Sequence, residues 1–107
     1  MLTLNDHLNR LVKHTSNSRD EILLAMKTNY HELTDDFLIV WSLSQEADGQ
    51  VMYVLFGSGD GLKSMKRLKE IARDNGCKRM YCVTQRPRGM ERKLGFKPVG
   101  VLMVQEV

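Results

Sequence analysis

The sequence predicts a single α/β (α+β) domain in which helices flank a mixed sheet. Three features support this fold class: apolar residues at helical spacing, two adjacent runs of strand-forming residues, and a later helix between two strand-like segments. The chain has 107 residues, of which 42% are hydrophobic and 27% charged, and these values are typical of one globular domain. We therefore expect one domain over residues 1–107, with N-terminal helices in 1–34 and a core in 37–105.

Two helices are predicted at the N-terminus. Leucines recur at helical spacing over residues 4–14, which indicates a first helix there. Ser18 and Glu21 fit a capping box, in which each residue binds the other's backbone amide. This box predicts that a second helix begins after Ser18 and continues to His31 or Glu32.

The predicted core begins with a hairpin. Residues 37–44 and 51–56 are rich in β-branched and aromatic side chains, and the Asp48-Gly49 pair between them favours a tight turn. Gly76 then suits the left-handed position that ends a helix. The elements expected after the hairpin are a helix at 62–75, a strand at 79–84, a short helix at 87–94 and a strand at 99–104.

Charge is distributed unevenly along the chain. Residues 1–61 contain four basic and nine acidic residues, a net charge of −5, whereas residues 62–97 contain twelve basic and three acidic ones, a net charge of +9. A positive segment of this kind favours anionic partners such as nucleic acid, a phosphorylated cofactor or an acidic protein.

Several classes of protein are not expected. No apolar run approaches the roughly 18–20 residues that cross a bilayer, and the N-terminus has no apolar signal segment, so we expect a cytoplasmic protein without a membrane partner. Cys77 and Cys82 complete no disulfide framework and no zinc site, which predicts reduced, buried thiols and no metal. His7, His14 and His31 are expected on exposed helix surfaces.

A glycine-rich segment connects the hairpin to the next helix. Gly57, Gly59 and Gly61 allow close approach to a ligand, and the free amides of the following helix favour phosphate binding. The dinucleotide fingerprint and the P-loop pattern both require a glycine where Leu62 stands. These two nucleotide-binding motifs are therefore disfavoured.

The segment resembles the pattern [QR]-x-x-G-x-[GA], the pyrophosphate loop of the GNAT superfamily of N-acetyltransferases. The downstream helix, strand and short helix are also similar to that family, whose short helix reads roughly Y-x-K-x-G-F. The matching residues are Gly59, Gly61, Lys93, Gly95 and Phe96. The resemblance covers residues 37–105 and implies an acyl-CoA N-acyltransferase-like mixed sheet that lacks the family's usual first strand.

The resemblance also implies a place for acetyl-CoA or another acyl-CoA as cosubstrate. The cofactor would lie in a wedge between two splayed parallel strands at residues 51–56 and 79–84, with its pyrophosphate on the loop and the helix start. The cofactor-binding residues implied in this way are Val54, Leu55, Phe56, Gly57, Ser58, Gly59, Asp60, Gly61, Leu62, Thr84, Arg88 and Lys93.

The chain departs from the family pattern at several positions. Phe56 replaces a polar residue at the loop entrance, Asp60 adds a negative charge beside the expected pyrophosphate, and Thr84 and Pro87 replace Asn and Ala. Glu91 stands where the family has a tyrosine that protonates the leaving CoA thiolate. Glu91 is therefore the candidate catalytic acid, and this role requires a raised pKa.

Three functions follow from these features. The first is an acyl-CoA-dependent N-acyltransferase that acts on a small-molecule or protein amine. The second is a catalytically degenerate binding or structural protein of the same fold, similar to some small proteins encoded by tailed phages. The third is a nucleic-acid-binding module that uses the basic segment. A sheet edge left open by the missing first strand would favour pairing with a second copy.

Overall fold

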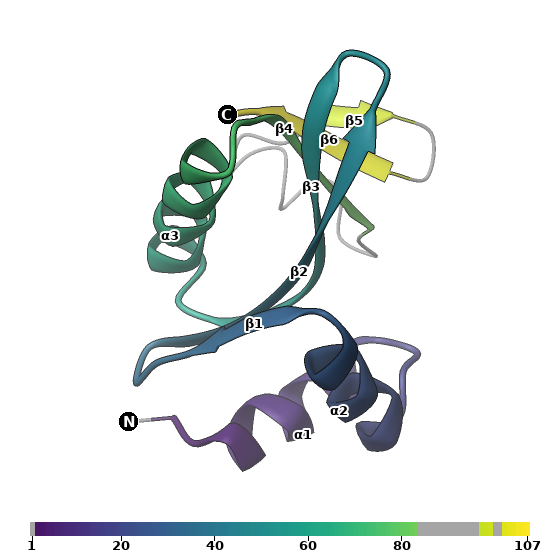
Figure 1. The fold of residues 1–107 in the computed structure, drawn as a ribbon. Coiled ribbons are helices and arrows are strands. Elements are labelled where there is room, and N and C mark those ends of the chain that lie inside the picture. The colour runs from purple at the N-terminus through teal and green to yellow at the C-terminus, as the bar shows by residue number, and fades with distance from the viewer. Residues whose placement is uncertain (1, 84–96, 100–101) are drawn as a thin grey trace.

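The computed structural model describes residues 2–83, 97–99 and 102–107. These residues form a mixed α+β fold with one six-stranded sheet, in the order β1-β2-β3-β4-β6-β5 (Figure 1). Its helices are α1 (Leu4–His14), α2 (Arg19–Thr28) and α3 (Gly61–Asp74), and its strands are β1 (Tyr30–Leu33), β2 (Phe37–Glu46), β3 (Gly49–Gly59), β4 (Cys77–Val83), β5 (Lys97–Val99) and β6 (Leu102–Glu106).

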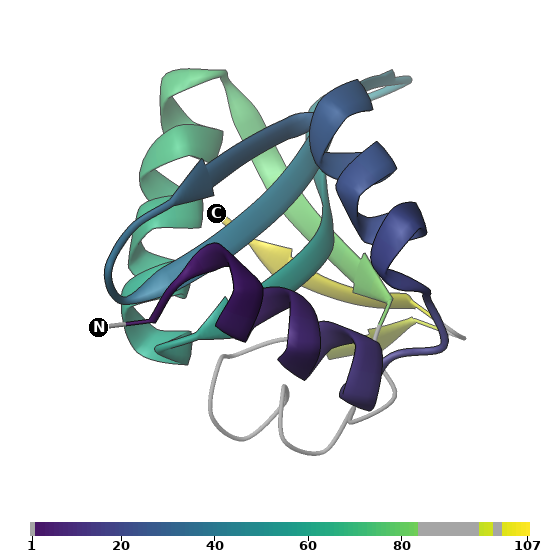
Figure 2. The same cartoon turned by 90° about the horizontal axis from the view of Figure 1, so that it is seen from below.

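Helices cover both faces of this sheet. α1 and α2 lie against one face and α3 lies against the other, as the two views show (Figures 1 and 2). Successive residues of a strand point to opposite faces, so Leu38 of β2 packs against α1 and α2 while Ile39 packs against α3. The first half of β2 is therefore buried on both faces, through Trp41.

The second helix is shorter than the sequence predicts. Its capping box of Ser18 and Glu21 is present as expected, but the helix ends at Thr28. The next residues form β1, which pairs with β2 in antiparallel register and stacks the ring of Tyr30 on that of Trp41. Pairing with the central hairpin has overridden the helical spacing of this segment, so the predicted helix to residue 31 or 32 is wrong.

The hairpin forms as predicted, with its turn at Ala47 and Asp48, and with Gly49 as the first residue of β3. β3 is longer than expected, because it continues to pair with β2 until Phe37↔Gly59. The segment predicted as a glycine loop is therefore mostly strand. Asp60 alone separates β3 from α3.

The C-terminal part completes the sheet. α3 carries the chain from β3 to β4, which lies parallel to β3, and Gly76 adopts a positive φ of 70° as predicted for a helix end. The single strand predicted at 99–104 is wrong, because β5 and β6 form an antiparallel pair there. The short helix predicted at 87–94 lies outside the described residues.

Candidate functional site

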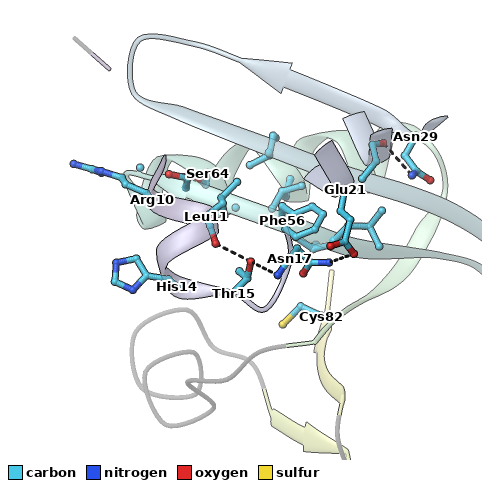
Figure 3. Close-up of a pocket in the computed structure, with 18 of the residues that line it drawn as sticks. Arg10, Leu11, His14, Thr15, Asn17, Glu21, Asn29, Phe56, Ser64 and Cys82 are labelled. Carbon is cyan, nitrogen blue, oxygen red and sulfur yellow. Dashed lines mark hydrogen bonds between the residues drawn. The ribbon is translucent and has the colours of Figure 1, made fainter. Parts of the chain in front are cut away.

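A groove of about 1160 Å³ opens where α1 and α2 face the end of β3. Its walls also include the start of α3 and the end of β4. Arg10 of α1, Phe56 of β3 and Cys82 of β4 gather around it from three separate elements (Figure 3). The groove therefore depends on the tertiary fold rather than on one motif.

On the side of β3 that faces β4, no strand within residues 2–83, 97–99 and 102–107 pairs with β3 beyond Val54. The parallel register between β3 and β4 runs to Val54↔Cys82, whereas β3 itself continues to Gly59. Residues 55–59 line the groove. In a strand, the backbone N–H and C=O groups of successive residues point to opposite sides. Some of these groups in residues 55–59 therefore point to β2, and the others point to the groove.

The splayed strands expected at residues 51–56 and 79–84 are not found as predicted, because β3 and β4 are paired from Gln50↔Cys77 to Val54↔Cys82, and this pairing counts against a cofactor wedge there. Val54 and Cys82 are paired neighbours in the sheet, so the strands have not separated at that point. Leu55 is the extra residue of a bulge, because Val40 pairs with Phe56 while Trp41 pairs with Val54. Such a bulge changes the direction of a strand, and the part of β3 without a described partner on the β4 side begins at this residue.

Most of the predicted cofactor-binding residues that the structure describes line this groove. These are Val54, Leu55, Phe56, Gly57, Ser58, Gly59 and Gly61. Asp60 and Leu62 are not among its lining residues, and Leu62 is 71% exposed. The other predicted site residues, Thr84, Arg88, Lys93 and the candidate acid Glu91, lie outside the described residues.

Gly59 has a structural reason to be glycine. Its φ is +104°, and a Cβ atom there would overlap the backbone carbonyl oxygen of Asp36. The amide of Asp60 donates to the same oxygen at 2.9 Å. The chain passes close to the β1–β2 connection at this point, so the fold itself requires this glycine.

The start of α3 carries its own anion. The Asp60 carboxylate caps the helix and accepts a hydrogen bond from the Lys63 amide at 3.0 Å. The Ser64 hydroxyl donates to the Asp60 carbonyl oxygen at 2.7 Å. One of the amides that a helix start offers to a ligand is therefore used internally, and a bound anion would lie near a carboxylate.

His7 is buried, which corrects the prediction that it lies on an exposed helix surface. Its ring is 0% exposed, and Nδ1 lies 2.9 Å from the Ser58 hydroxyl oxygen. Nε2 is also buried and has no hydrogen-bond partner within the described part of the chain. Burial lowers the pKa of His7. Its place three residues after Leu4 and four before Leu11, on the apolar stripe of α1, was the signal for burial.

Sequence reasoning missed the contribution of the N-terminal helices to the groove. Arg10 and His14 line it from α1, and Glu21 lines it from α2 (Figure 3). The Ser18 amide donates to the Glu21 carboxylate at 3.0 Å and lowers its pKa. Burial raises the pKa of the Cys82 thiol to about 11, which keeps this thiol protonated at neutral pH.

Ion pairs with residues 1–61, the acidic part of the chain, partly neutralise the basic residues of 62–97. Arg67 of α3 binds Glu32 of β1 at 2.8 Å and Glu70 at 3.3 Å. These hydrogen bonds, above all that to Glu32, raise the pKa of Arg67. Two further ion pairs, Lys63 with Asp36 and Arg79 with Asp48, also join the two halves. Less charge thus remains for an external anion than the sequence suggests.

Comparison with models of known protein families gives no match, and comparison with curated proteins finds none that is similar. Within residues 2–83, 97–99 and 102–107, no cluster of His, Cys, Asp or Glu side chains could hold a metal ion. The same residues contain no helix with the length and hydrophobicity needed to span a membrane. Cys77 and Cys82 are free and buried, as predicted.

Proposed function

We propose that this chain binds an acyl-CoA in the groove and transfers the acyl group to an amine. The observation that carries the proposal is the edge of β3 at residues 55–59, which lines the groove next to the start of α3 and which no strand in the described part of the chain pairs with on the β4 side. The GNAT superfamily resemblance and the mixed sheet support the same function. Two free, buried thiols fit a reducing compartment, so we place the activity in the cytoplasm.

This edge of β3 offers the chemistry that an acyl-CoA requires. The pantetheine arm is extended and contains amide groups, and such a chain can pair with an unused strand edge. A backbone N–H aimed at the thioester carbonyl would stabilise the negative charge that develops on its oxygen. Apolar side chains from β3 and α3, including Val54 and Met65, line the same groove and can pack around the acyl group.

The transfer itself is a direct displacement. The neutral amine nitrogen would attack the thioester carbonyl carbon and form the amide bond as the carbon–sulfur bond breaks. The nitrogen then loses one proton, and the sulfur gains one, so that CoA leaves as the thiol. Orientation in the groove supplies much of the rate enhancement. Glu91 remains the predicted acid for the proton that the sulfur gains, and the amine must reach the site deprotonated.

A second candidate is a protein of the same fold that binds or assembles without catalysis. The observation that favours it is the Asp60 carboxylate, which caps α3 where an anionic cofactor would approach. Repulsion at this position weakens phosphate binding. A nucleic-acid function gains less support, because the basic residues Lys63, Arg67 and Arg79 are bound to acidic side chains.

Calorimetry with acetyl-CoA tests the proposal. We expect saturable binding by the wild type and at least tenfold weaker binding by Gly57→Phe, because this position lines the groove and has open space for a side chain. Gly57→Ala is the matched control and should bind within about threefold of the wild type. No detectable binding at millimolar acetyl-CoA overturns the proposal, and binding without CoA release across an amine panel supports the second candidate.

A further inference from the structure

A buried histidine and a groove serine form a pair that the proposed reaction does not yet use. His7 lies on α1 among Leu8 and Leu11, on the face that covers Leu38 of β2. Its ring is fully buried, and it reaches across to the end of β3 to contact the Ser58 hydroxyl at 2.9 Å. Ser58 is half-buried and lines the groove, so the pair links the interior of the α1 face to the candidate site.

The unpartnered ring nitrogen favours one direction for this hydrogen bond. If the Ser58 hydroxyl donated to Nδ1, the proton would lie on Nε2, and a buried N–H would have no acceptor. If Nδ1–H donates to the hydroxyl, Nε2 is left with only an unused lone pair. Buried N–H groups without an acceptor are rarer than buried acceptors without a donor. His7 is therefore the donor and the serine oxygen is the acceptor.

This direction leaves the Ser58 proton available. A serine hydroxyl has one proton and two lone pairs, so accepting from His7 does not use its O–H. Ser64, which also lines the groove, differs in this respect, since its hydroxyl already donates to the Asp60 carbonyl oxygen at 2.7 Å. Of these two serines, Ser58 alone keeps its O–H proton available to a ligand.

We propose that His7 is a positioning residue that holds the Ser58 hydroxyl as a hydrogen-bond donor to an oxygen of the bound acyl-CoA. The inference rests on the proposed function and names a ligand contact within the same groove. His7 does not touch the ligand. Its Nδ1–H binds one lone pair of the Ser58 oxygen, which limits rotation of the hydroxyl and keeps the O–H bond directed toward the groove. Leu4 and Leu11, which lie before and after His7 on the same stripe of α1, both pack in the apolar cluster under this helix.

A double-mutant cycle measured by calorimetry with acetyl-CoA tests this role. We expect about tenfold weaker binding for Ser58→Ala, as for the loss of one hydrogen bond to a ligand. His7→Leu should weaken binding to a similar extent, and the double variant should bind no more weakly than either single one. His7→Asn, whose amide can donate from nearly the same place as Nδ1–H, should restore binding to within about threefold. Ser44→Ala changes a half-buried serine at the far end of β2 and should bind as the wild type does.

The outcomes separate this inference from the function on which it rests. Wild-type binding with no loss in Ser58→Ala, or additive losses from His7→Leu and Ser58→Ala, overturns the inference and leaves the proposed function standing. If the wild type does not bind acetyl-CoA, the proposed function is overturned, and so is the contact of Ser58 with the acyl-CoA. If His7→Leu does not fold, the ¹⁵N chemical shifts of the wild-type ring decide. A proton on Nδ1 supports the assignment, and a proton on Nε2 overturns it.

Discussion

The two faces of the sheet are held together in different ways. The face under α3 has a large apolar cluster to which α3, β2, β3 and β4 all contribute, and ion pairs from Lys63 and Arg67 fasten α3 to the region around β1. The face under α1 and α2 has a smaller cluster, and the polar ring of His7 is buried on the same helix as its members Leu8 and Leu11. The groove lies between the two faces, because its lining includes Met65 and Leu68 of the α3 cluster as well as Leu11 of the cluster under α1 and α2.

This contrast shows how a small domain can combine a stable core with a site. Local stability varies within a protein, and regions with fewer buried apolar contacts open more easily. We therefore expect the parallel β3–α3–β4 unit, with its larger cluster, to open less readily than α1 and α2. A polar contact beside the smaller cluster, such as that of His7 with Ser58, then affects the site without disturbing the larger one.

The largest expected effect is on the free energy of unfolding, and it comes from alanine substitutions at two neighbouring residues of β2 that face opposite sides of the sheet. Ile39 faces α3 and Leu38 faces α1 and α2, and both are 0% exposed. We expect Ile39→Ala and Leu38→Ala each to lower the free energy of unfolding by about 2–5 kcal/mol in urea denaturation. Amide hydrogen exchange should distinguish them, because Leu38→Ala should accelerate exchange in α1 and α2 more than in α3. Equal acceleration in all three helices by both variants would show that the faces do not differ.

Alanine substitutions at Gly57 and Gly59, which both line the groove, show which of these glycines the fold itself requires. Gly59→Ala should lower the free energy of unfolding by at least ~2 kcal/mol, because φ is +104° and the new Cβ would overlap the Asp36 carbonyl oxygen. Gly57→Ala, with open space around its Cβ, should change stability by less than ~0.5 kcal/mol. Thermal unfolding without ligand measures both. A wild-type melting temperature for Gly59→Ala would indicate that this glycine serves only a ligand.

The sequence predicted the elements whose signals are local. The capping box of Ser18 and Glu21, the hairpin turn before Gly49 and the helix stop at Gly76 were all recognised, because each depends on a few adjacent residues. The boundaries that failed depend on distant partners. Tyr30 became part of a strand because β2 was available to pair with it.

The groove was predicted in part for the same reason. Its β3 wall follows the chain, so the residues from Val54 to Gly59 could be named from a motif. The wall made by Arg10, His14 and Glu21 could not, since no short pattern connects α1 and α2 to β3. The buried state of His7 was readable from its place on the apolar stripe of α1, but its contact with a serine 51 residues later was not.

The smallest expected effect is on the pH dependence of the free energy of unfolding, and it tests whether His7 is buried beneath α1. Burial holds the pKa of His7 below its ordinary value of about 6.5, the nearby Arg10 guanidinium lowers it further, and Asp6 opposes this shift. The unfolded chain therefore takes up a proton at His7 at a higher pH than the folded one. Acid shifts such an equilibrium toward unfolding, so stability should fall as the pH drops through about 6.5 and level off once the folded ring is also protonated.

His7→Asn isolates this contribution, because asparagine keeps a polar side chain but does not titrate. Urea denaturation of both proteins at intervals from pH 7.5 to 5 should show the wild type losing more stability than the variant over this range. The difference should shrink toward pH 7.5, where the ring is mostly neutral in the folded and unfolded states alike. Parallel curves for the two proteins would mean that His7 is protonated as easily in the fold as outside it. The ring would then be accessible to water, and the smaller face of the sheet would be open where the structure has it closed.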